Sequence, residues 1–237
     1  MFPNTCSGRT LRLPKILLAI VSLLGSASLV ISRTPAAERP SRETISVVKR
    51  AVVIVTTFDG QGKPLLQGSG FFIKTDCIVT AMHVIKDAVQ IRIKTFDGKS
   101  GTVQNVIATN ENTDLALLHV ENSLAEAVLQ LDDAAPAEGQ AIVVVSNPQG
   151  SSWKTTRGRV GPLWEFAGTS GRMQITAAIF PGSSGGPVVN EQGRVIGVAA
   201  MHLASADGLN FAVPAESLKT LQASTSVKPT SPLTKRN

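Results

Sequence analysis

The sequence predicts an all-β protein with a short C-terminal helix. Between residues 45 and 213, short runs rich in Val, Ile, Phe and Thr follow one another, separated by Gly, Asn, Asp or Pro. Short apolar runs with turn residues at regular spacing are typical of barrels and sandwiches. The helical patterns that alternate with strands in a parallel βαβ sheet do not occur between these runs.

A dozen strands are expected. The run at 89–94 alternates strictly between apolar and polar residues, as a half-buried strand does. Asp97-Gly98 and Gln192-Gly193 each lie between two apolar runs, so both are candidates for hairpin turns. The expected strands are residues 51–57, 69–74, 77–80, 89–94, 102–108, 115–120, 141–145, 155–160, 172–178, 186–190, 195–202 and 210–213.

One helix is expected over residues 215–223, where Leu218 and Leu221 fall on the same side of a helix. We expect residues 45–223 to form the folded domain, with two strand-rich halves that divide near 132–140. The polar tail at 224–237 is expected to be disordered.

The basic charge of the chain lies in its first 50 residues. The net charge is +6, and residues 1–50, with eight Lys or Arg and two Glu, account for all of it. The remaining residues hold fifteen basic and fifteen acidic side chains. Because nucleic-acid binding needs an excess of positive charge, we expect no nucleic-acid partner.

Residues 1–37 have the pattern of an export segment. Three basic residues precede an apolar run at 16–31. Sixteen residues are many for a signal core and few for a membrane span. Two interpretations therefore remain open: a cleaved signal peptide, or an uncleaved anchor in the inner membrane. Either one predicts an exported protein, periplasmic or secreted, and residues 38–44 are expected to be a linker.

Cysteine and metal-ligating residues are few. Cys6 lies in the export segment, and Cys77 lies in an apolar run and is expected to be a buried thiol. No cluster of His, Cys and Asp has metal-ligand spacing, so neither a metal nor another cofactor is expected.

Residues 181–187 have the sequence Pro-Gly-Ser-Ser-Gly-Gly-Pro. An acyl-transfer nucleophile needs a sharp turn that exposes one hydroxyl and leaves backbone N–H groups free to bind an oxyanion. Small residues allow the backbone to approach a substrate this closely. Alone, such a run predicts no more than a turn.

His83 and Asp114 support the interpretation of the serine run as a nucleophile loop. His83 follows an expected strand, and Asp114 precedes another, where a carboxylate should be partly buried and paired. Their order with Ser184 is His, Asp, Ser, which is the order of the chymotrypsin triad. Serine hydrolysis needs a hydroxyl, a base in contact with it and a carboxylate that orients the base, and these three residues supply one of each. Ser183 remains a second candidate for the nucleophile.

With these motifs the chain resembles the trypsin-like serine proteases, and among them the HtrA/Deg group, over about residues 45–221. The matching segments are Gly68-Ser69-Gly70-Phe71-Phe72, Thr80 to Val84, Thr113 to Leu118, Ala177 to Asn190, Gly193 to Val198 and Asn210 to Pro214. The resemblance implies two six-stranded antiparallel β-barrels of the chymotrypsin-like fold. It also implies that Ser184 is the nucleophile, that His83 is the general base and that Asp114 orients the imidazole. The N–H groups of Gly182 and Ser184 are implied to form an oxyanion hole.

The resemblance further implies a substrate pocket walled by Ala178, Val198 and Met201. Ala178 stands where family members that cut after Lys or Arg carry an aspartate, so small or medium aliphatic residues are expected before the cut. The implied substrates are exported, unfolded proteins or peptides. No PDZ domain is expected after Leu221. Both a monomer and a trimer remain open.

The sequence departs from the HtrA pattern at two places. Ser183 replaces the usual Asn, and Thr80-Ala81-Met82 replaces a Thr-Asn pair before the histidine. Neither change removes a reacting atom, so a serine endopeptidase is expected. The alternative is an inactive protease fold that binds peptides or acts like a chaperone.

Overall fold

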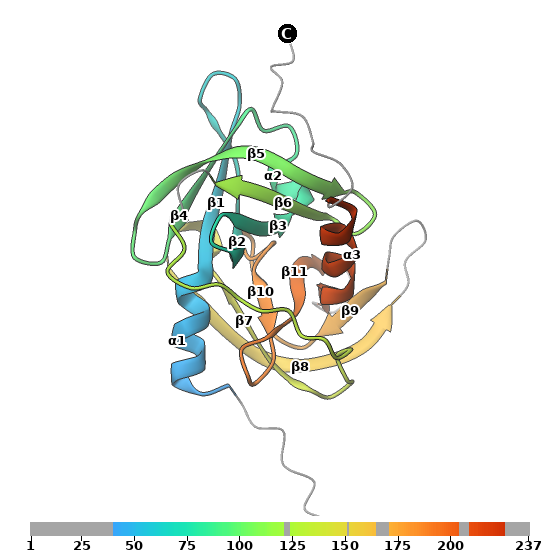
Figure 1. Cartoon of the computed structure of the whole chain (residues 1–237). Helices are drawn as coiled ribbons and strands as arrows, with labels where there is room; N and C mark the ends of the chain where they lie inside the picture. Colours follow the sequence, from blue (N-terminus) through green and yellow to red (C-terminus); the bar gives the residue numbers. More distant parts are fainter. Residues whose placement is uncertain (1–39, 121–123, 151, 165–170, 204–208, 226–237) are drawn as a thin grey trace, which may run out of the picture. The chain divides into compact units, whose positions relative to one another are not determined.

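The computed structural model describes residues 40–120, 124–150, 152–164, 171–203 and 209–225, without the side chains of 149 and 201–203. All of them belong to one compact unit, Ala37–Asn237. Within these residues, twelve strands form two closed six-stranded antiparallel barrels (Figure 1). The predicted all-β fold with two barrels and a C-terminal helix is therefore confirmed.

The two barrels have the same topology. The first joins its strands in the order β1-β2-β3-β6-β5-β4, and the second in the equivalent order β7-β8-β9-β12-β11-β10. The first barrel consists of β1 (Val52–Phe58), β2 (Pro64–Lys74), β3 (Cys77–Ala81), β4 (Gln90–Thr95), β5 (Ser100–Asn110) and β6 (Leu115–Val120). The second consists of β7 (Ala141–Ser146), β8 (Lys154–Trp164), β9 (Arg172–Ile175), β10 (Pro187–Val189), β11 (Val195–Leu203) and β12 (Leu209–Pro214).

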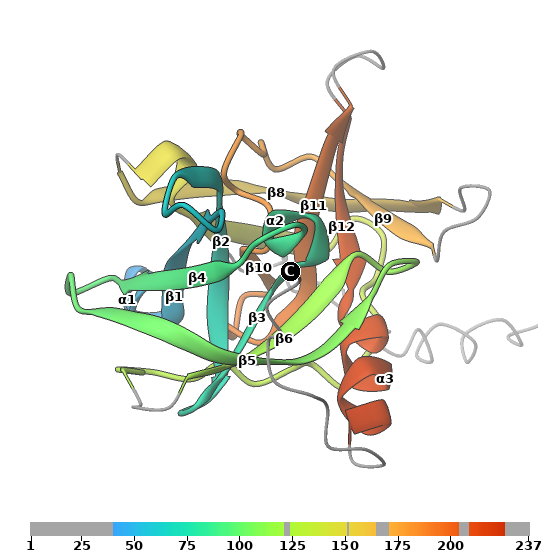
Figure 2. The same cartoon turned by 90° about the horizontal axis from the view of Figure 1, so that it is seen from above.

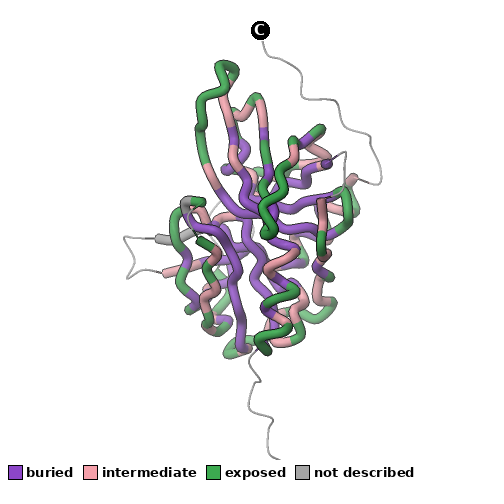
Figure 3. The backbone as a smooth tube through the Cα atoms, turned by 90° about the vertical axis from the view of Figure 1, so that its left-hand side faces the viewer, coloured by how far each residue is buried: buried purple, intermediate pink, exposed green. Residues whose placement is uncertain are grey.

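Alternation along the strands produces three apolar cores. In β7, Ile142 and Val144 face the interior of the second barrel, whereas Val143 and Val145 belong to a cluster shared with the first barrel. β3 divides its residues in the same way between the first barrel and the shared cluster. Both strands are therefore buried along their whole length, which explains their continuous apolar runs. In Figure 3 the buried segments run through the middle of the molecule and the exposed segments lie at its periphery.

Helix α1 (Arg42–Ala51) was not predicted, and its first residues fall in the expected linker at 38–44. Ser41 caps it, because the Ser41 Oγ accepts a hydrogen bond from the Thr44 N–H at 3.0 Å. Ile45, Val48 and Ala51 recur at helical spacing and are buried. The β-branched residues around them favoured a strand, and burial of this face overrode that preference.

Helix α3 (Ala215–Thr225) confirms the predicted helix and continues to Thr225, two residues into the expected tail. The Ser224 and Thr225 hydroxyls each donate to a carbonyl oxygen of the last turn, at 2.7 Å. α3 contacts β5 and β6 of the first barrel and β11 and β12 of the second (Figure 2).

No helix among the described residues is long and apolar enough to cross a membrane. The apolar run at 16–31 and the tail at 226–237 lie outside the described residues.

Candidate active site

His83 and Asp114 are brought together by the pairing of β3 with β6, in which Ala81 lies opposite Leu115. His83 follows β3 in the one-turn helix α2 (Met82–Ile85), which was not predicted, and Asp114 directly precedes β6. The Asp114 Oδ2 lies 2.7 Å from the His83 Nδ1, and its Oδ1 accepts from the His83 backbone N–H at 2.8 Å. One carboxylate therefore fixes both the ring and the backbone of the histidine.

The backbone of Asp114 supports this contact. Its φ of 58° lies in the left-handed region, which Asp and Asn tolerate better than most residues. Its carbonyl oxygen also accepts from the Met82 N–H at 3.0 Å. With Nδ1 bound to the carboxylate, Nε2 is the ring atom left for a reaction partner.

Ser184 is the second residue of the second of two consecutive turns, which share Ser183. The Ser183 N–H donates to the Phe180 carbonyl at 2.8 Å, and the Gly186 N–H donates to the Ser183 carbonyl at 3.0 Å. The third position of each turn is a glycine with positive φ, Gly182 at 90° and Gly185 at 88°. That conformation is the one a type II turn requires at this position. The Gly/Pro content of the run is therefore what gives the chain its sharp double bend.

Two backbone N–H groups in the double turn have no acceptor. The N–H groups of Gly182 and Ser184 donate to no protein atom in the part of the chain that the structure describes. They are the two groups proposed from the sequence to form an oxyanion hole. Free N–H groups in a rigid turn are suited to binding an anionic oxygen.

Ser69 of β2 holds the double turn from the first barrel. Its N–H donates to the Ser184 carbonyl at 2.9 Å, and its hydroxyl donates to the Gly182 carbonyl at 2.8 Å. The same hydroxyl accepts from the Asn147 N–H at 3.1 Å. In the sequence analysis Ser69 was part of a segment that matches the family, but no role was assigned to it. Its signal was a small polar residue between two glycines in a run that is otherwise apolar.

The two serines have different surroundings. Ser183 is only 1% exposed, and its hydroxyl lies 3.0 Å from the Ser146 hydroxyl and accepts from the Phe180 N–H at 3.2 Å. Ser184 is partly exposed, and its hydroxyl donates to the Ala200 carbonyl at 3.1 Å. Of the two, Ser184 is the one a substrate can reach.

No hydrogen bond joins His83 to Ser184 among the described residues. The His83 side chain is 47% exposed and the Asp114 side chain 20% exposed. Side chains of exposed residues change rotamer on a ps–ns timescale, and catalytic hydrogen bonds are often absent without substrate. The structure therefore shows a linked His–Asp pair and a serine whose hydroxyl is bonded elsewhere.

The three expected pocket residues lie in different environments. Ala178 is exposed, and its carbonyl accepts from the Thr156 hydroxyl at 2.8 Å. Val198 is fully buried in the shared core, so its side chain cannot touch a substrate in this structure. The side chain of Met201 lies outside the described residues. Phe180 is 42% exposed beside the double turn, an apolar surface that the sequence did not single out.

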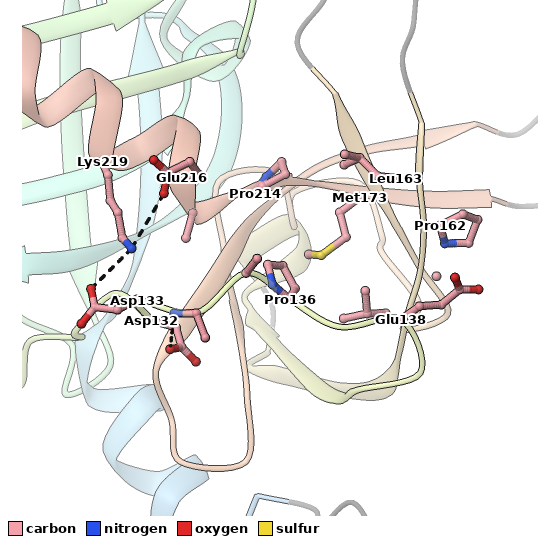
Figure 4. A pocket seen from close by; sticks show the side chains of 15 residues that line it. Asp132, Asp133, Pro136, Glu138, Pro162, Leu163, Met173, Pro214, Glu216 and Lys219 are labelled. Carbon is pink, nitrogen blue, oxygen red and sulfur yellow. Dashed lines mark hydrogen bonds and ion pairs between the residues drawn. The ribbon is translucent and has the colours of Figure 1, made fainter.

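A cavity of about 460 Å³ lies elsewhere, between the second barrel and the first turn of α3 (Figure 4). Its lining includes apolar side chains such as Leu163 and Met173. The Lys219 Nζ in this lining is 3.4 Å from the Asp133 Oδ1 and 3.9 Å from the Glu216 Oε2. None of His83, Asp114 and Ser184 lines it. Cys77 is buried, as expected, and no group of three or more His, Cys, Asp or Glu among the described residues could hold a metal ion.

Two barrels of one topology, with a His–Asp pair on the first and a serine turn on the second, define a protein of the chymotrypsin-like fold. A family model for the trypsin-like peptidase domain matches residues 68–198, more than half of the chain. The chain therefore belongs to this family.

The curated relatives include HtrA-type proteases. The chain is 35% identical over 166 residues to the putative serine protease HhoA of Synechocystis sp., covering 66% of this chain and 42% of that protein. It is 34% identical over 165 residues to a probable periplasmic serine endoprotease DegP-like of Bartonella henselae, covering 66% of this chain and 33% of that protein. An anti-sigma-I factor, RsgI9 of Acetivibrio thermocellus, is 32% identical over 194 residues, covering 81% of this chain and 27% of that protein. The chain thus spans less than half the length of these relatives.

Solved structures support the fold. A serine endoprotease from Yersinia pestis aligns with a TM-score of 0.69 and 24% identity, covering 79% of this chain and 68% of that one. The active form of a protease from M. tuberculosis aligns with a TM-score of 0.71 and 22% identity, covering 84% of this chain and 95% of that one. Both likenesses confirm the two-barrel fold.

Proposed function

We propose that the protein is a serine endopeptidase that hydrolyses peptide bonds through a His83–Asp114–Ser184 triad. The observation that carries the proposal is the double contact of Asp114 with the ring and backbone of His83. That contact leaves Nε2 of His83 as the only ring atom able to accept a proton. Acyl transfer requires an oriented imidazole that can take the proton of a serine hydroxyl, and a sharp turn that exposes this hydroxyl.

The reaction follows from these roles. The Ser184 hydroxyl leaves Ala200, its Oγ attacks the scissile carbonyl carbon, and His83 Nε2 takes the hydroxyl proton. The imidazolium then gives that proton to the leaving nitrogen as the C–N bond breaks, which leaves an ester on Ser184. A water molecule, deprotonated by His83 Nε2, then attacks the ester carbon. As the ester C–O bond breaks, the imidazolium returns this proton to the Ser184 Oγ, which restores the serine and releases the carboxylic acid product. Asp114 stabilises the imidazolium at both stages.

The N–H groups of Gly182 and Ser184 would bind the oxyanion of each tetrahedral intermediate. Their lack of a protein acceptor supports this role. In comparable sites, removing one such donor costs about 10²–10³-fold in kcat.

Substrate preference would depend on Ala178 and its neighbours. Ala178 is exposed and carries no charge to pair with Lys or Arg, so we propose aliphatic residues before the cut. The fully buried Val198 makes no contribution in this conformation. Phe180 offers a further apolar surface for the substrate chain. Digestion of an unfolded protein, with the cut sites read by mass spectrometry, tests this preference, and predominant cutting after Lys or Arg would contradict it.

We also propose that the substrates are exported, unfolded proteins and that the enzyme acts in the periplasm or is secreted. The relative named as a periplasmic endoprotease and the basic-apolar pattern of residues 1–37 support this location. The apolar run at 16–31 would be a signal peptide or a membrane anchor, and the enzyme a monomer or a trimer. The N-terminal mass of exported protein distinguishes a cleaved signal from an anchor.

One observation favours a second function, a protease fold that binds peptides without cutting them. The Ser184 hydroxyl is bonded to Ala200 and not to His83. A fluorophosphonate, which reacts only with an activated serine, separates the two functions. We expect it to label the wild type and Ser183→Ala, the matched control, but not Ser184→Ala. Folded wild type that stays unlabelled would contradict the endopeptidase and favour the binding module.

A further inference from the structure

Two adjoining hollows beside α1 and β8 share the side chain of Arg157. The first, of about 390 Å³, is lined by Arg42 and Lys49 of α1 together with Arg157 of β8. The second, of about 280 Å³, is lined by Arg157 and Arg159 of β8 and by Pro40. The four cationic side chains, Arg42, Lys49, Arg157 and Arg159, are called the basic face below.

Local structure directs all four side chains to this face. Arg42 and Lys49 are two helical turns apart in α1, so they lie on one side of the helix. Arg157 and Arg159 are two positions apart in β8, so they lie on one face of the strand. Arg157 is paired with Val143 of β7, whose side chain belongs to the shared cluster and not to the interior of the second barrel. The basic face therefore lies on the outside of that barrel, next to α1.

The charge of the basic face is not balanced by acidic residues in the part of the chain that the structure describes. Of the described residues, no Asp or Glu lines either hollow, and Glu43, the acidic residue of α1, lines neither. None of the four cations forms an ion pair within the described ranges. Arg159 has a neutral partner, since its Nη1 donates to the Gly139 carbonyl at 2.6 Å. A group of like charges on one face attracts anions.

The N-terminal segment joins the folded domain at this face. Pro40, the first described residue, lines the second hollow. The apolar run at 16–31 ends nine residues before Pro40, and nine residues of fully extended chain span at most about 32 Å. The surface of a bilayer that holds this run is therefore within about 32 Å of Pro40.

We propose that the basic face docks on anionic phospholipid headgroups at the surface of the membrane that holds residues 16–31. The proposal rests on the anchored form of the location proposed above. Each Lys or Arg close to an anionic bilayer strengthens binding about fivefold. Phe96, which is 40% exposed and lines the first hollow, adds an aromatic ring of the kind that is enriched at the headgroup level. Docking would hold the protease domain in one orientation on the membrane.

Energy transfer from tryptophan to labelled lipid tests this docking in the full chain. Trp153 reports on the basic face, because its ring centroid lies 5.3 Å from that of Phe96, and Trp164→Phe removes the other tryptophan. The chain is reconstituted in phosphatidylcholine vesicles, with or without phosphatidylglycerol, that carry a trace of dansyl-labelled lipid. Transfer should rise with the anionic lipid. Salt at about 1 M, where the Debye length is about 3 Å, should abolish the rise.

Two matched pairs of substitutions locate the contact. Arg157→Gln with Arg159→Gln removes two cations of the basic face, so the ratio of docked to free domains should fall about 25-fold. Lys63→Gln with Lys74→Gln removes two cations of the first barrel that line neither hollow, and it should leave the transfer unaltered. Because all four of these side chains are exposed, the substitutions should not impair folding.

The outcomes separate the lipid from a competing occupant, an acidic protein. Equal transfer in the two kinds of vesicle overturns the inference, and so does an equal loss in both pairs of variants. Oligoglutamate that binds the full chain through Arg157 and Arg159, without any effect of phosphatidylglycerol, would assign the basic face to an acidic protein and overturn the lipid.

Sedimentation of the vesicles in high salt tests the anchor separately. A chain that stays with the vesicles but shows no rise in transfer with phosphatidylglycerol keeps the anchor and refutes the docking. A chain that is released refutes the anchor, and a rise in transfer on anionic vesicles at low salt then still supports the docking of the basic face.

Discussion

The Ser69 hydroxyl donates a 2.8 Å hydrogen bond to the carbonyl oxygen of Gly182, although the two residues are 113 positions apart and belong to different barrels. Together with the bond from the Ser69 N–H to the Ser184 carbonyl, it fixes the double turn against β2. The precise placement of the serine therefore depends on a residue that takes no part in the proposed chemistry.

Ser69→Ala should impair the site more than the fold. The change leaves the Gly182 carbonyl and the Asn147 N–H without a partner, at a cost of about 1–3 kcal/mol in the free energy of unfolding. A small displacement of the nucleophile should lower kcat/KM about 10–100-fold. Urea unfolding and steady-state kinetics measure the two effects. Ser100→Ala, at an exposed position, is the control, and an unchanged kcat/KM in Ser69→Ala would contradict the role of Ser69.

Gly185 and Gly98 form a matched pair for testing the double turn. Both have positive φ, 88° and 90°, but an added Cβ would meet the Ser69 carbonyl oxygen at Gly185 and nothing within 4 Å at Gly98. Gly98→Ala should therefore cost only the backbone strain, about 1–2 kcal/mol. Gly185→Ala should destabilise the protein by more than about 4 kcal/mol or prevent folding. Equal melting temperatures for the two variants would show that space at Gly185 is not limiting.

The differences between prediction and structure have a common physical origin. The strands were predictable because alternation and turn residues are local. The residues proposed for the triad could be singled out because small residues and charges stand out in apolar surroundings. α1 was missed because its buried face is defined only by the barrels on which it packs. The role of Ser69 depends on contacts between barrels, over 113 positions, which no local pattern encodes. The topology that brings such residues together has to be known before their function can be inferred.

Cys77 should make stability depend on pH in the alkaline range. Burial raises the pKa of its thiol from 9.0 to about 11. Below pH 9 the thiol is protonated in both states. Between pH 9 and 11 it ionises only in the unfolded chain, so the free energy of unfolding should fall by about 1.4 kcal/mol per pH unit.

The measurement compares urea unfolding of the parent protein with Cys77→Ala at pH 8, 9, 10 and 11, in a Cys6→Ala background so that one thiol remains. Because other groups also titrate in this range, the difference between the two proteins is the quantity to follow. The free energy of unfolding of the parent minus that of Cys77→Ala should fall by about 2–3 kcal/mol between pH 9 and 11. A constant difference would mean that the thiol ionises equally in both states.

Asp114→Asn tests the tautomer that the carboxylate imposes. Asn tolerates the left-handed backbone at this position, so the free energy of unfolding should change little. Its amide would donate to His83 Nδ1, which moves the ring proton to Nε2, the atom that must accept the Ser184 proton. We expect kcat to fall on the order of 10⁴-fold. The chain offers a matched control in Asp76, whose Oδ2 lies 3.9 Å from the His119 Nδ1. Asp76→Asn makes the same change at a His–Asp pair outside the site and should leave kcat unaltered, whereas a loss below tenfold in Asp114→Asn would remove Asp114 from the mechanism.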